Sequence, residues 1–462
     1  MLLAAPPEGM TIVAWRTAAV GALMAIWWIT EAIPIPATAL LPIVLFPLLG
    51  IAPLTATTAP YANEVIYLFL GGFLIAKALE SCGLHRRMAL TILRVVGTRP
   101  ANLILGFMIA TAFISMWVSN TATVVMLLPM ATSVIALARG KDEESFRTPG
   151  RAFDAALLLG IAYAASIGGL GTLIGTPPNA LLAGFMRQSY NVEIGFFDWM
   201  LLGVPIVVIA LPFAWFLLTR LLYRLGSEPV VGGAAMLEQE RHAIGPMSRA
   251  EWAVGAITAL TAAAWVTRPI LDEWMPALSD SGIAIAGALL MFIVPMTLRP
   301  LRAALTWTQA ERLPWSVLIL FGGGLSLAAA IQQTGLSAWI GGSLGALAGW
   351  PLFAVLLTVT AVIILLSELA SNTATAAAFL PVAASLALVI GADPLLLTVT
   401  AALAASGGFM LPVATPPNAI VYGTGALTVP QMARAGLWLN IFFALLLPLV
   451  VYVLAGRIFS PA

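Results

Sequence analysis

The five-residue stretch SNTAT at residues 119–123 recurs unchanged at residues 371–375. A second motif follows each copy, as GTPPN at residues 175–179 and as ATPPN at residues 414–418. All four motifs lie within chain that is otherwise strongly apolar. In a membrane protein, a pair of repeated polar motifs indicates two symmetry-related, unwound elements that bind a solute. The sequence therefore predicts a transporter.

The composition is typical of a membrane protein. Hydrophobic residues make up 61% of the 462 residues, charged residues make up 9%, and the mean hydropathy is +1.01. Soluble chains carry roughly 25% charged residues, so this chain cannot cover a water-facing surface. The single cysteine, Cys82, excludes a disulfide within the chain. No basic segment precedes the first apolar run, so we expect a membrane helix from about Thr11 and no cleaved signal peptide.

The apolar runs predict an all-α polytopic membrane protein with about ten full crossings of ~20 residues. Two further segments, 101–138 and 350–390, each hold two apolar arms joined at the Ser-Asn-Thr motif. An arm of about 16 residues spans only ~24 Å as a helix, so each segment fits a re-entrant hairpin better than two crossings. The polar stretch 220–251 is expected to be a loop. The predicted crossings are 11–29, 37–53, 63–83, 153–186, 198–220, 251–268, 281–298, 314–334, 394–424 and 436–457.

An internal repeat divides the chain. Phe69 and Gly83 align with Phe321 and Gly335 at an offset of 252 residues, which also separates residue 119 from residue 371. The Thr-Pro-Pro motifs are offset by 239, and an extra polar loop, 139–151, explains the difference of 13. Each half has five crossings and one hairpin, and because five is odd the halves are expected to be inverted in the membrane. The predicted parts are a first repeat at 1–224, a cytoplasmic linker loop at 225–250 and a second repeat at 251–462.

The basic residues favour this topology, because cytoplasmic segments of membrane proteins are rich in Lys and Arg. If the segment after the third crossing is cytoplasmic, so are 16 of the 21 lysines and arginines. The first hairpin then opens from the cytoplasm and the second from the opposite side. We expect a multi-pass protein of the bacterial plasma membrane. The 16 are Arg86, Arg87, Arg94, Arg99, Arg139, Lys141, Arg147, Arg151, Arg220, Arg224, Arg241, Arg249, Arg299, Arg302, Arg312 and Arg434.

The Ser-Asn-Thr tips are predicted to line a binding site. Unwound backbone is tolerated in the membrane only where it lines a cavity inside the protein. Hydroxyl, amide and carbonyl oxygens are the hard ligands that Na⁺ prefers. Ser and Asn are also favoured N-cap residues, and the second arm of each hairpin is expected to begin just after them. The positive end of that arm's dipole would then face the middle of the membrane.

The Thr-Pro-Pro motifs are predicted to break the helices at 153–186 and 394–424. Proline lacks an N–H and prefers the first turn of a helix. Thr176 and Thr415 are therefore expected to cap a second half-helix that starts at the prolines. Four helix N-termini near one point would attract an anion without a nearby Lys or Arg.

Ionisable residues in the apolar segments are functional candidates. Glu368 lies three residues before Ser371, where the first hairpin has Met116. We expect its carboxylate to tune ion binding, to accept a proton or to be hydrogen-bonded structure. Lys77 and Glu80 are three residues apart on one helix and are expected to pair. The two histidines, His85 and His242, lie in charged segments and are expected to be solvated.

The doubled Ser-Asn-Thr and Thr-Pro-Pro motifs resemble those of the divalent anion:sodium symporter family, whose members carry dicarboxylates, citrate or sulfate. The resemblance covers nearly the whole chain, although many members have an additional helix before the repeat. It implies a homodimer in which a transport domain moves past a scaffold domain by an elevator mechanism. It also implies two Na⁺ sites, each between a hairpin tip and a broken helix, and no organic cofactor.

The resemblance further implies specific site residues. The first Na⁺ would be bound by Ser115, Ser119, Asn120 and the Gly175 carbonyl, and the second by Ser367, Ser371, Asn372 and the Ala414 carbonyl. Substrate carboxylates would contact Asn120, Thr121, Thr176, Asn372, Thr373, Thr415 and Pro416.

The function that we expect from the sequence is symport of a C4-dicarboxylate, such as succinate, fumarate or malate, with several Na⁺. The alternatives are a sodium-independent dicarboxylate exchanger, a sulfate or tricarboxylate carrier of the same fold, a Na⁺/H⁺ antiporter and a channel. We do not expect an enzyme, because the sequence shows no metal triad, no Asp-rich diphosphate motif and no nucleophile with a base. We expect the lipid bilayer to surround the protein, and we expect no nucleic-acid partner.

Overall fold

The structure is a computed structural model and describes residues 5–139, 152–226, 228–230, 232–298, 301–343, 347 and 349–459. The described residues are almost entirely helical, with one short antiparallel pair of strands, β1 (Pro295–Leu298) and β2 (Leu301–Ala303). Nine helices in this part of the chain are long and apolar enough to cross a membrane. The prediction of an all-α polytopic membrane protein is therefore confirmed. The predicted extra loop at 139–151 lies outside the described residues except for its first residue.

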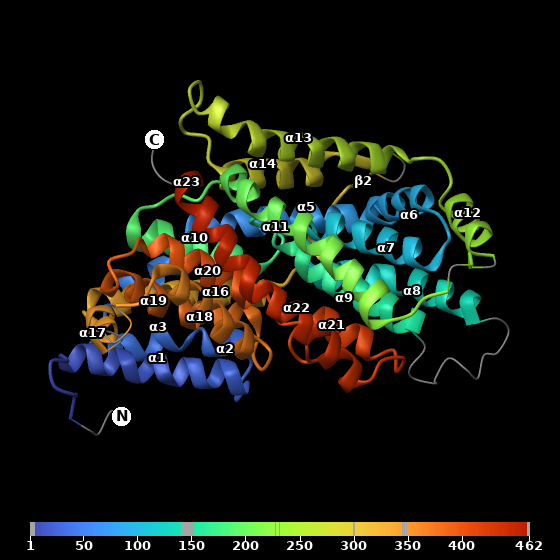
Figure 1. Cartoon of the computed structure of the whole chain (residues 1–462). Coiled ribbons are helices and arrows are strands. Elements are labelled where there is room, and N and C mark those ends of the chain that lie inside the picture. The colour runs from blue at the N-terminus through green and yellow to red at the C-terminus, as the bar shows by residue number, and fades with distance from the viewer. Residues whose placement is uncertain are drawn as a thin grey trace.

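The first half of the chain runs from the blue to the green part of Figure 1. Polar side chains cap two of its long helices, since Thr11 accepts a hydrogen bond from Ala14 N at 3.1 Å and Asn63 accepts one from Val65 N at 3.0 Å. The elements are α1 (Ile12–Thr30), α2 (Ile35–Thr38), α3 (Leu41–Leu48), α4 (Leu54–Thr58), η1 (Ala59–Ala62), α5 (Glu64–Cys82), α6 (Leu84–Val96), α7 (Pro100–Ser115), α8 (Asn120–Arg139), α9 (Ala152–Gly169), α10 (Pro177–Tyr190), α11 (Phe196–Phe216) and η3 (Leu217–Leu222).

The second half follows in green, yellow and red (Figure 1). Capping boxes at Ser248 and Thr428 fix the starts of two of its long helices. The elements are α12 (Gly233–Ile244), α13 (Arg249–Leu271), α14 (Asp280–Ile293), β1, β2, α15 (Trp307–Ala310), α16 (Trp315–Gln333), α17 (Leu336–Ser343), α18 (Leu352–Ser367), α19 (Asn372–Val389), α20 (Pro394–Ala405), α21 (Pro416–Tyr422), α22 (Val429–Val450), η5 (Val451–Ala455) and α23 (Gly456–Ile458).

Three predicted segments differ from the structure. The crossing predicted at 37–53 is divided into α2 and α3, because prolines at 34, 36, 42 and 47 remove helix N–H donors. The crossing predicted at 281–298 ends as a helix at Ile293, and Pro295 begins β1. The loop predicted at 220–251 contains α12, whose Ala, Met, Leu, Glu, Gln and Arg residues are strong helix formers.

The order of elements in α5–α11 is repeated in α16–α22. Gly83 and Gly335 end α5 and α16 with nearly the same left-handed φ, 77° and 76°. The rings of Phe69 and Phe321 contact one another edge to face, with centroids 5.1 Å apart. These two residues are the ones that the predicted repeat aligns at an offset of 252 residues.

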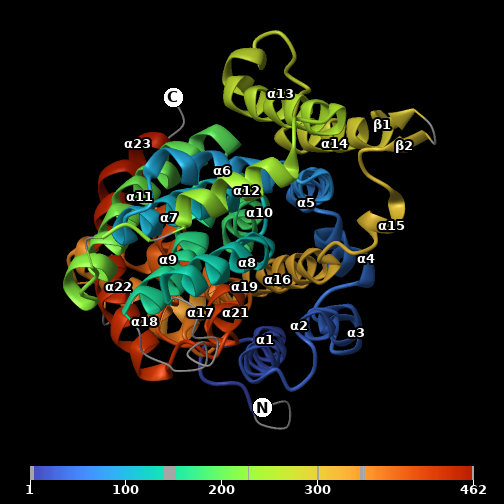
Figure 2. The ribbon, with the colours of Figure 1, turned by 90° about the vertical axis from the view of Figure 1, so that its right-hand side faces the viewer.

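Figure 2 shows that the helices form two groups. One group consists of α1–α5 and α13–α16, and the other contains most of α6–α12 and α17–α23. Glycines bring helices of the first group into backbone contact. A Cβ on Gly71 of α5 would lie 2.6 Å from the backbone of Ala284 in α14, and one on Gly323 of α16 would lie 2.3 Å from Ala39 O. Such contacts are typical of membrane helices that pack through small residues.

One expectation about the histidines is wrong. His85 is only 9% exposed, and its Nδ1 lies 3.0 Å from Leu79 O. Burial lowers the pKa of His85, so the imidazole is neutral at pH 7. The charged neighbours Arg86 and Arg87 made the segment look solvated, but α6 is amphipathic and His85 is on its buried face. His242 is exposed, as predicted.

Candidate functional site

The four repeated motifs meet at one cavity of about 930 Å³. Residues far apart in the sequence line it together, because two helix tips and two broken helices end there. Ser115 and Ser367 lie just behind the tips and do not line the cavity themselves. The predicted site residues that line it are Ser119, Asn120, Thr121, Gly175, Thr176, Ser371, Asn372, Thr373, Ala414, Thr415 and Pro416.

Each Ser-Asn-Thr motif forms the turn between two helices. In the first half, α7 ends at Ser115 and α8 begins at Asn120. Ser119 caps α8 by accepting a hydrogen bond from Ala122 N at 3.3 Å. In the second half, α19 begins at Asn372, but Ser371 makes no capping hydrogen bond. The predicted helix starts are therefore confirmed, whereas capping by the serine side chain occurs only in the first half.

A cluster of oxygens lies behind the first tip. Ser115 donates a hydrogen bond to Ala165 O at 2.9 Å. With its amide nitrogen turned toward them, Asn120 reaches Ser115 Oγ at 2.6 Å, Ala165 O at 3.1 Å and Gly175 O at 3.2 Å. Gly169 leaves room for this cluster, since a Cβ there would lie 2.7 Å from the side-chain amide of Asn120 and 3.1 Å from Gly175 O. The Ser115 hydroxyl and the main-chain oxygens of Ala165 and Gly175 thus converge on the Asn120 amide, whose oxygen would join them when the amide turns to face a bound cation.

The second tip is built in the same way. Ser367 donates to Asn372 Oδ1 at 2.9 Å and also to Ala405 O. Gly408 corresponds to Gly169, and a Cβ on it would lie 3.2 Å from both Ser367 O and Ala414 Cβ. The second tip therefore brings together Ser367, Asn372 and Ala414. The corresponding residues of the first tip are Ser115, Asn120 and Gly175.

The Thr-Pro-Pro motifs begin the second half of each broken helix, as predicted. The first break separates α9 from α10 and the second separates α20 from α21. Thr415 caps α21 by accepting from Asn418 N at 3.3 Å. The prediction that Thr176 caps α10 is wrong, because its side chain makes no capping hydrogen bond. The N–H of Asn179 instead donates to the backbone oxygen of Thr176 at 3.2 Å.

The asparagine that ends each Thr-Pro-Pro-Asn motif forms hydrogen bonds with main-chain oxygens at the break in the helix. Asn179 donates to Gly169 O at 3.1 Å and to Thr172 O at 2.8 Å, and Asn418 donates to Leu411 O at 3.0 Å. Both side chains are fully buried. Neither asparagine was predicted to have a role, although both copies of the motif end in Asn.

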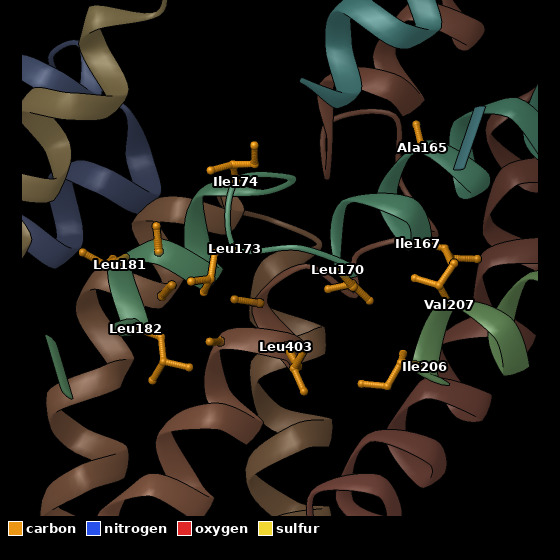
Figure 3. Close-up of a cluster of buried hydrophobic side chains, with 14 of the residues drawn as sticks. Ala165, Ile167, Leu170, Leu173, Ile174, Leu181, Leu182, Ile206, Val207 and Leu403 are labelled. Carbon is orange, nitrogen blue, oxygen red and sulfur yellow. The ribbon is translucent and has the colours of Figure 1, made fainter. Parts of the chain in front are cut away.

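Apolar side chains support the first break. Figure 3 shows Leu170, Leu173 and Ile174 of the nonhelical segment among buried side chains of α10, α11 and α20. Trp199 of α11 donates from Nε1 to Leu170 O at 3.0 Å. The break is therefore a fixed part of the protein core, and only Ile174 also lines the cavity among the apolar residues of this segment.

Charged side chains also line the cavity. Lys77 and Glu80 of α5 form the predicted ion pair, with Nζ 3.0 Å from Oε2. Arg312, just before α16, and Glu31, just after α1, also line the cavity. The prediction that no Lys or Arg lies near the motifs is wrong. The approach of α5 and α16 to the motifs arises from tertiary packing, which spacing along the chain did not reveal.

Glu368 is hydrogen-bonded, as one of its three expected roles requires, and its roles in ion binding and proton transfer stay predictions. Its carboxylate accepts from the N–H groups of Phe409, Met410 and Leu411 and from the amide of Asn440. Glu368 is only 4% exposed and does not line the cavity.

The chain matches a family of membrane transporters over almost its whole length. The sequence profile described as the sodium:sulfate symporter transmembrane region matches residues 1–459. The sodium-dependent dicarboxylate transporter SdcS of Staphylococcus aureus strain USA300 is 43% identical over 434 residues, which are 93% of this chain and 84% of the relative. SdcS of strain MRSA252 is 42% identical over the same length.

Solved structures with low sequence identity share the fold. The YdaH transporter of Alcanivorax borkumensis superposes with a TM-score of 0.61 at 16% identity, covering 96% of this chain and 98% of that one. MtrF of Neisseria gonorrhoeae superposes with a TM-score of 0.57 at 13% identity, covering 96% and 95%.

Proposed function

Because the chain belongs to the sodium:sulfate symporter family, we propose that it carries C4-dicarboxylates such as succinate, fumarate and malate together with Na⁺. It is a transporter and not an enzyme, and it is a multi-pass protein of the bacterial plasma membrane. The observation that carries the proposal is the single cavity at which both copies of both motifs meet. The relatives named for sodium-dependent dicarboxylate transport share over 40% of their aligned residues with it.

The two oxygen clusters are the proposed Na⁺ sites. Na⁺ is a hard cation that prefers hydroxyl and carbonyl oxygens, and these clusters supply both. The proposed ligands of the first ion are Ser115, Ser119, Asn120 and the Gly175 carbonyl. Those of the second ion are Ser367, Ser371, Asn372 and the Ala414 carbonyl.

The substrate would occupy the cavity between the two clusters. The N-termini of α8, α10 and α19 meet there, and the positive ends of their dipoles favour a carboxylate. The proposed contacts are Asn120, Thr121, Thr176, Asn372, Thr373, Thr415 and Pro416. A dianion costs much free energy to desolvate, and two bound Na⁺ offset part of that cost. The affinities for Na⁺ and for the dicarboxylate then depend on each other, which couples the two fluxes.

We propose that the structure represents an inward-open state. Four charged residues that line the cavity lie at helix ends that the predicted topology places on the cytoplasmic side. They are Glu31, Lys77, Glu80 and Arg312. At the opposite ends of the helices, Arg268 of α13 pairs with Glu193 at 2.6 Å and with Asp280 at 3.4 Å. The Arg268–Glu193 pair joins the two helix groups on the side away from the cavity, whereas the Arg268–Asp280 pair lies within the first group.

The two helix groups suggest an elevator mechanism. The hairpins α7–α8 and α18–α19 and the broken helices would move past α1–α5 and α13–α16 as one transport domain. We also propose that the hairpins are re-entrant, that the halves are inverted repeats and that the protein is a homodimer. Mass measurement of the purified transporter by light scattering in detergent tests the dimer directly.

Removal of Na⁺ tests the coupling. Uptake of labelled succinate into proteoliposomes should fall by about tenfold or more when choline replaces Na⁺, because the anion site then lacks its partner charges. Ionic strength is kept constant so that screening does not change. Equal uptake in the two media would exclude symport and would favour the sodium-independent exchanger.

Counterflow of labelled succinate tests the substrate class. We expect unlabelled fumarate and malate to compete, and sulfate and citrate to compete only weakly. Strong competition by sulfate or citrate would instead support the sulfate or tricarboxylate carrier.

Arg312 is expected to raise the local concentration of anions at the mouth of the cavity. Arg312→Ala should increase the KM for succinate by about threefold at low salt and by less at high salt, because the attraction is screened. Arg224 is also exposed but does not line the cavity, so Arg224→Ala is a matched control. A KM that changes equally in both variants would show that only net charge matters.

A further inference from the structure

The breaks in the two halves lie against equivalent glycines. Gly203 of α11 touches the first break, since a Cβ on it would lie 2.4 Å from Leu170 O. Gly436 of α22 touches the second break, since a Cβ would lie 2.3 Å from Phe409 O. The two glycines therefore mark corresponding points, from which the residues facing each break can be compared.

One helical turn later, the facing helices carry different residues. Val207 follows Gly203 by four positions, and Asn440 follows Gly436 by four. Figure 3 shows Val207 with Leu170 in the apolar core beside the first break. Asn440 is equally buried, at 5% exposure, but it is polar.

The two hairpins also present residues of different polarity to the breaks. The side chain of Met116 lies against the first break, because a Cβ on Gly171 would lie 2.9 Å from Met116 Cε. Glu368 occupies the corresponding position 252 residues later. The first break is thus faced by the apolar residues Met116 and Val207, and the second by the acid Glu368 and the amide Asn440.

The carboxylate of Glu368 binds the second break closely. Oε1 accepts from Phe409 N at 2.7 Å and Met410 N at 2.9 Å, and Oε2 accepts from Leu411 N at 2.9 Å. Asn440 donates to Oε1 at 2.6 Å. A buried carboxylate is costly unless it is hydrogen-bonded, and these main-chain N–H groups belong to a segment without helical partners. The carboxylate and the main-chain N–H groups of the second break therefore satisfy each other's hydrogen-bonding capacity.

From this geometry we propose that Glu368 is a positioning residue for the second Na⁺ site, an inference that rests on the sodium-coupled function proposed above. Ala414, whose carbonyl is a proposed ligand, lies three residues after Leu411 in the same nonhelical segment. Glu368 connects this segment to the hairpin that carries Ser371 and Asn372. It thereby fixes the position of the Ala414 carbonyl relative to the hairpin oxygens.

The first proposed Na⁺ site has no acidic residue at the position that corresponds to Glu368. Gly171 N donates to Gly168 O at 2.9 Å, so the first break keeps a turn of its own. Ser115 and Asn120 then reach the oxygens of Ala165 and Gly175 directly. The two Na⁺ sites should consequently respond differently to substitutions behind their hairpin tips.

Sodium titration of Glu368→Gln tests the proposal. The amide leaves one acceptor oxygen for three N–H groups, so the Na⁺ concentration for half-maximal succinate uptake should rise by about tenfold. The maximal rate per folded transporter at saturating Na⁺ should change little. A merely structural role would lower the amount of folded protein without changing the half-maximal Na⁺ concentration. Na⁺ should also raise the melting temperature of the protein without substrate. The Na⁺ concentration that gives half of this rise should increase by the same factor in Glu368→Gln.

Two further variants complete the test. Asn440→Ala keeps the bonds between Glu368 and the main chain, so the half-maximal Na⁺ concentration should rise by about threefold, even if Glu368→Gln does not fold. Met116→Leu changes the equivalent position of the first half and should remain within twofold of the wild type. The proposal is overturned if Asn440→Ala and every folded Glu368 variant keep the wild-type Na⁺ dependence. Wild-type uptake that does not require Na⁺ contradicts the proposed function instead.

Discussion

Alanine at Asn120 or at Asn372 is expected to abolish dicarboxylate uptake while leaving the fold intact. Asn120 joins Ser115, Ala165 and Gly175, and Asn372 accepts from Ser367. Each asparagine is a proposed ligand of both Na⁺ and the substrate, so its loss removes two sets of contacts. Loss of a buried hydrogen-bonding partner costs up to about 3 kcal/mol, which corresponds to about a hundredfold in binding. Uptake of labelled succinate into proteoliposomes measures the effect.

Asn102 provides a matched control for these two variants. Its amide donates to Val96 O at 3.1 Å, and it does not line the cavity. Asn102→Ala should keep uptake within about twofold of the wild type, since a single partly exposed hydrogen bond contributes about 1 kcal/mol or less. Wild-type uptake by both Asn120→Ala and Asn372→Ala would show that the proposed site is wrong.

Alanine at Gly168 is expected to separate the first hairpin from the first broken helix. A Cβ there would lie 2.3 Å from Ala112 O and 2.5 Å from Ala112 Cα. Because these atoms belong to the backbone of α7, no side-chain rotation relieves the contact, and α9 has to move away. Overpacking of this kind costs about 1–3 kcal/mol or more. The same two helices carry Ser115 and Ala165, so the first oxygen cluster would open as well.

We expect Gly168→Ala to lower the melting temperature by several degrees and uptake by about tenfold or more. Gly342→Ala is the control, because Gly342 is helical and a Cβ there would meet nothing within 4 Å. That variant should be as stable as the wild type, or slightly more stable, because Ala favours helix over Gly. Equal melting temperatures for the two variants would contradict the close backbone contact.

The sequence predicted that the four motifs meet, but it did not predict the charged side chains that line the same cavity. A motif that occurs twice, in register with Phe69 and Phe321, requires two equivalent elements, and equivalent elements in a transporter converge near one axis. Lys77 and Arg312 reach the cavity only through the packing of α5 and α16, which leaves no signal in local spacing. Long-range packing of this kind depends on many contacts at once.

Identical motifs also gave different local structures. Thr176 and Thr415 are both followed by Pro-Pro-Asn and have nearly the same φ, −143° and −142°, yet only Thr415 caps its helix. The surroundings of the breaks differ, with Met116 near the first and Glu368 near the second. A side-chain hydrogen bond depends on the rotamer that those surroundings allow, so the sequence motif alone could not distinguish the two threonines.

The edge-to-face contact between Phe69 and Phe321 bears on the origin of the protein. If the two halves are inverted repeats, as we propose above, a half-length ancestor would have paired with an oppositely oriented copy of itself, and this ring would have contacted the same ring of that copy. Gene duplication and fusion would preserve that contact while freeing each copy to diverge. Glu368, whose counterpart in the first copy is Met116, is the kind of difference that becomes possible only after such a fusion.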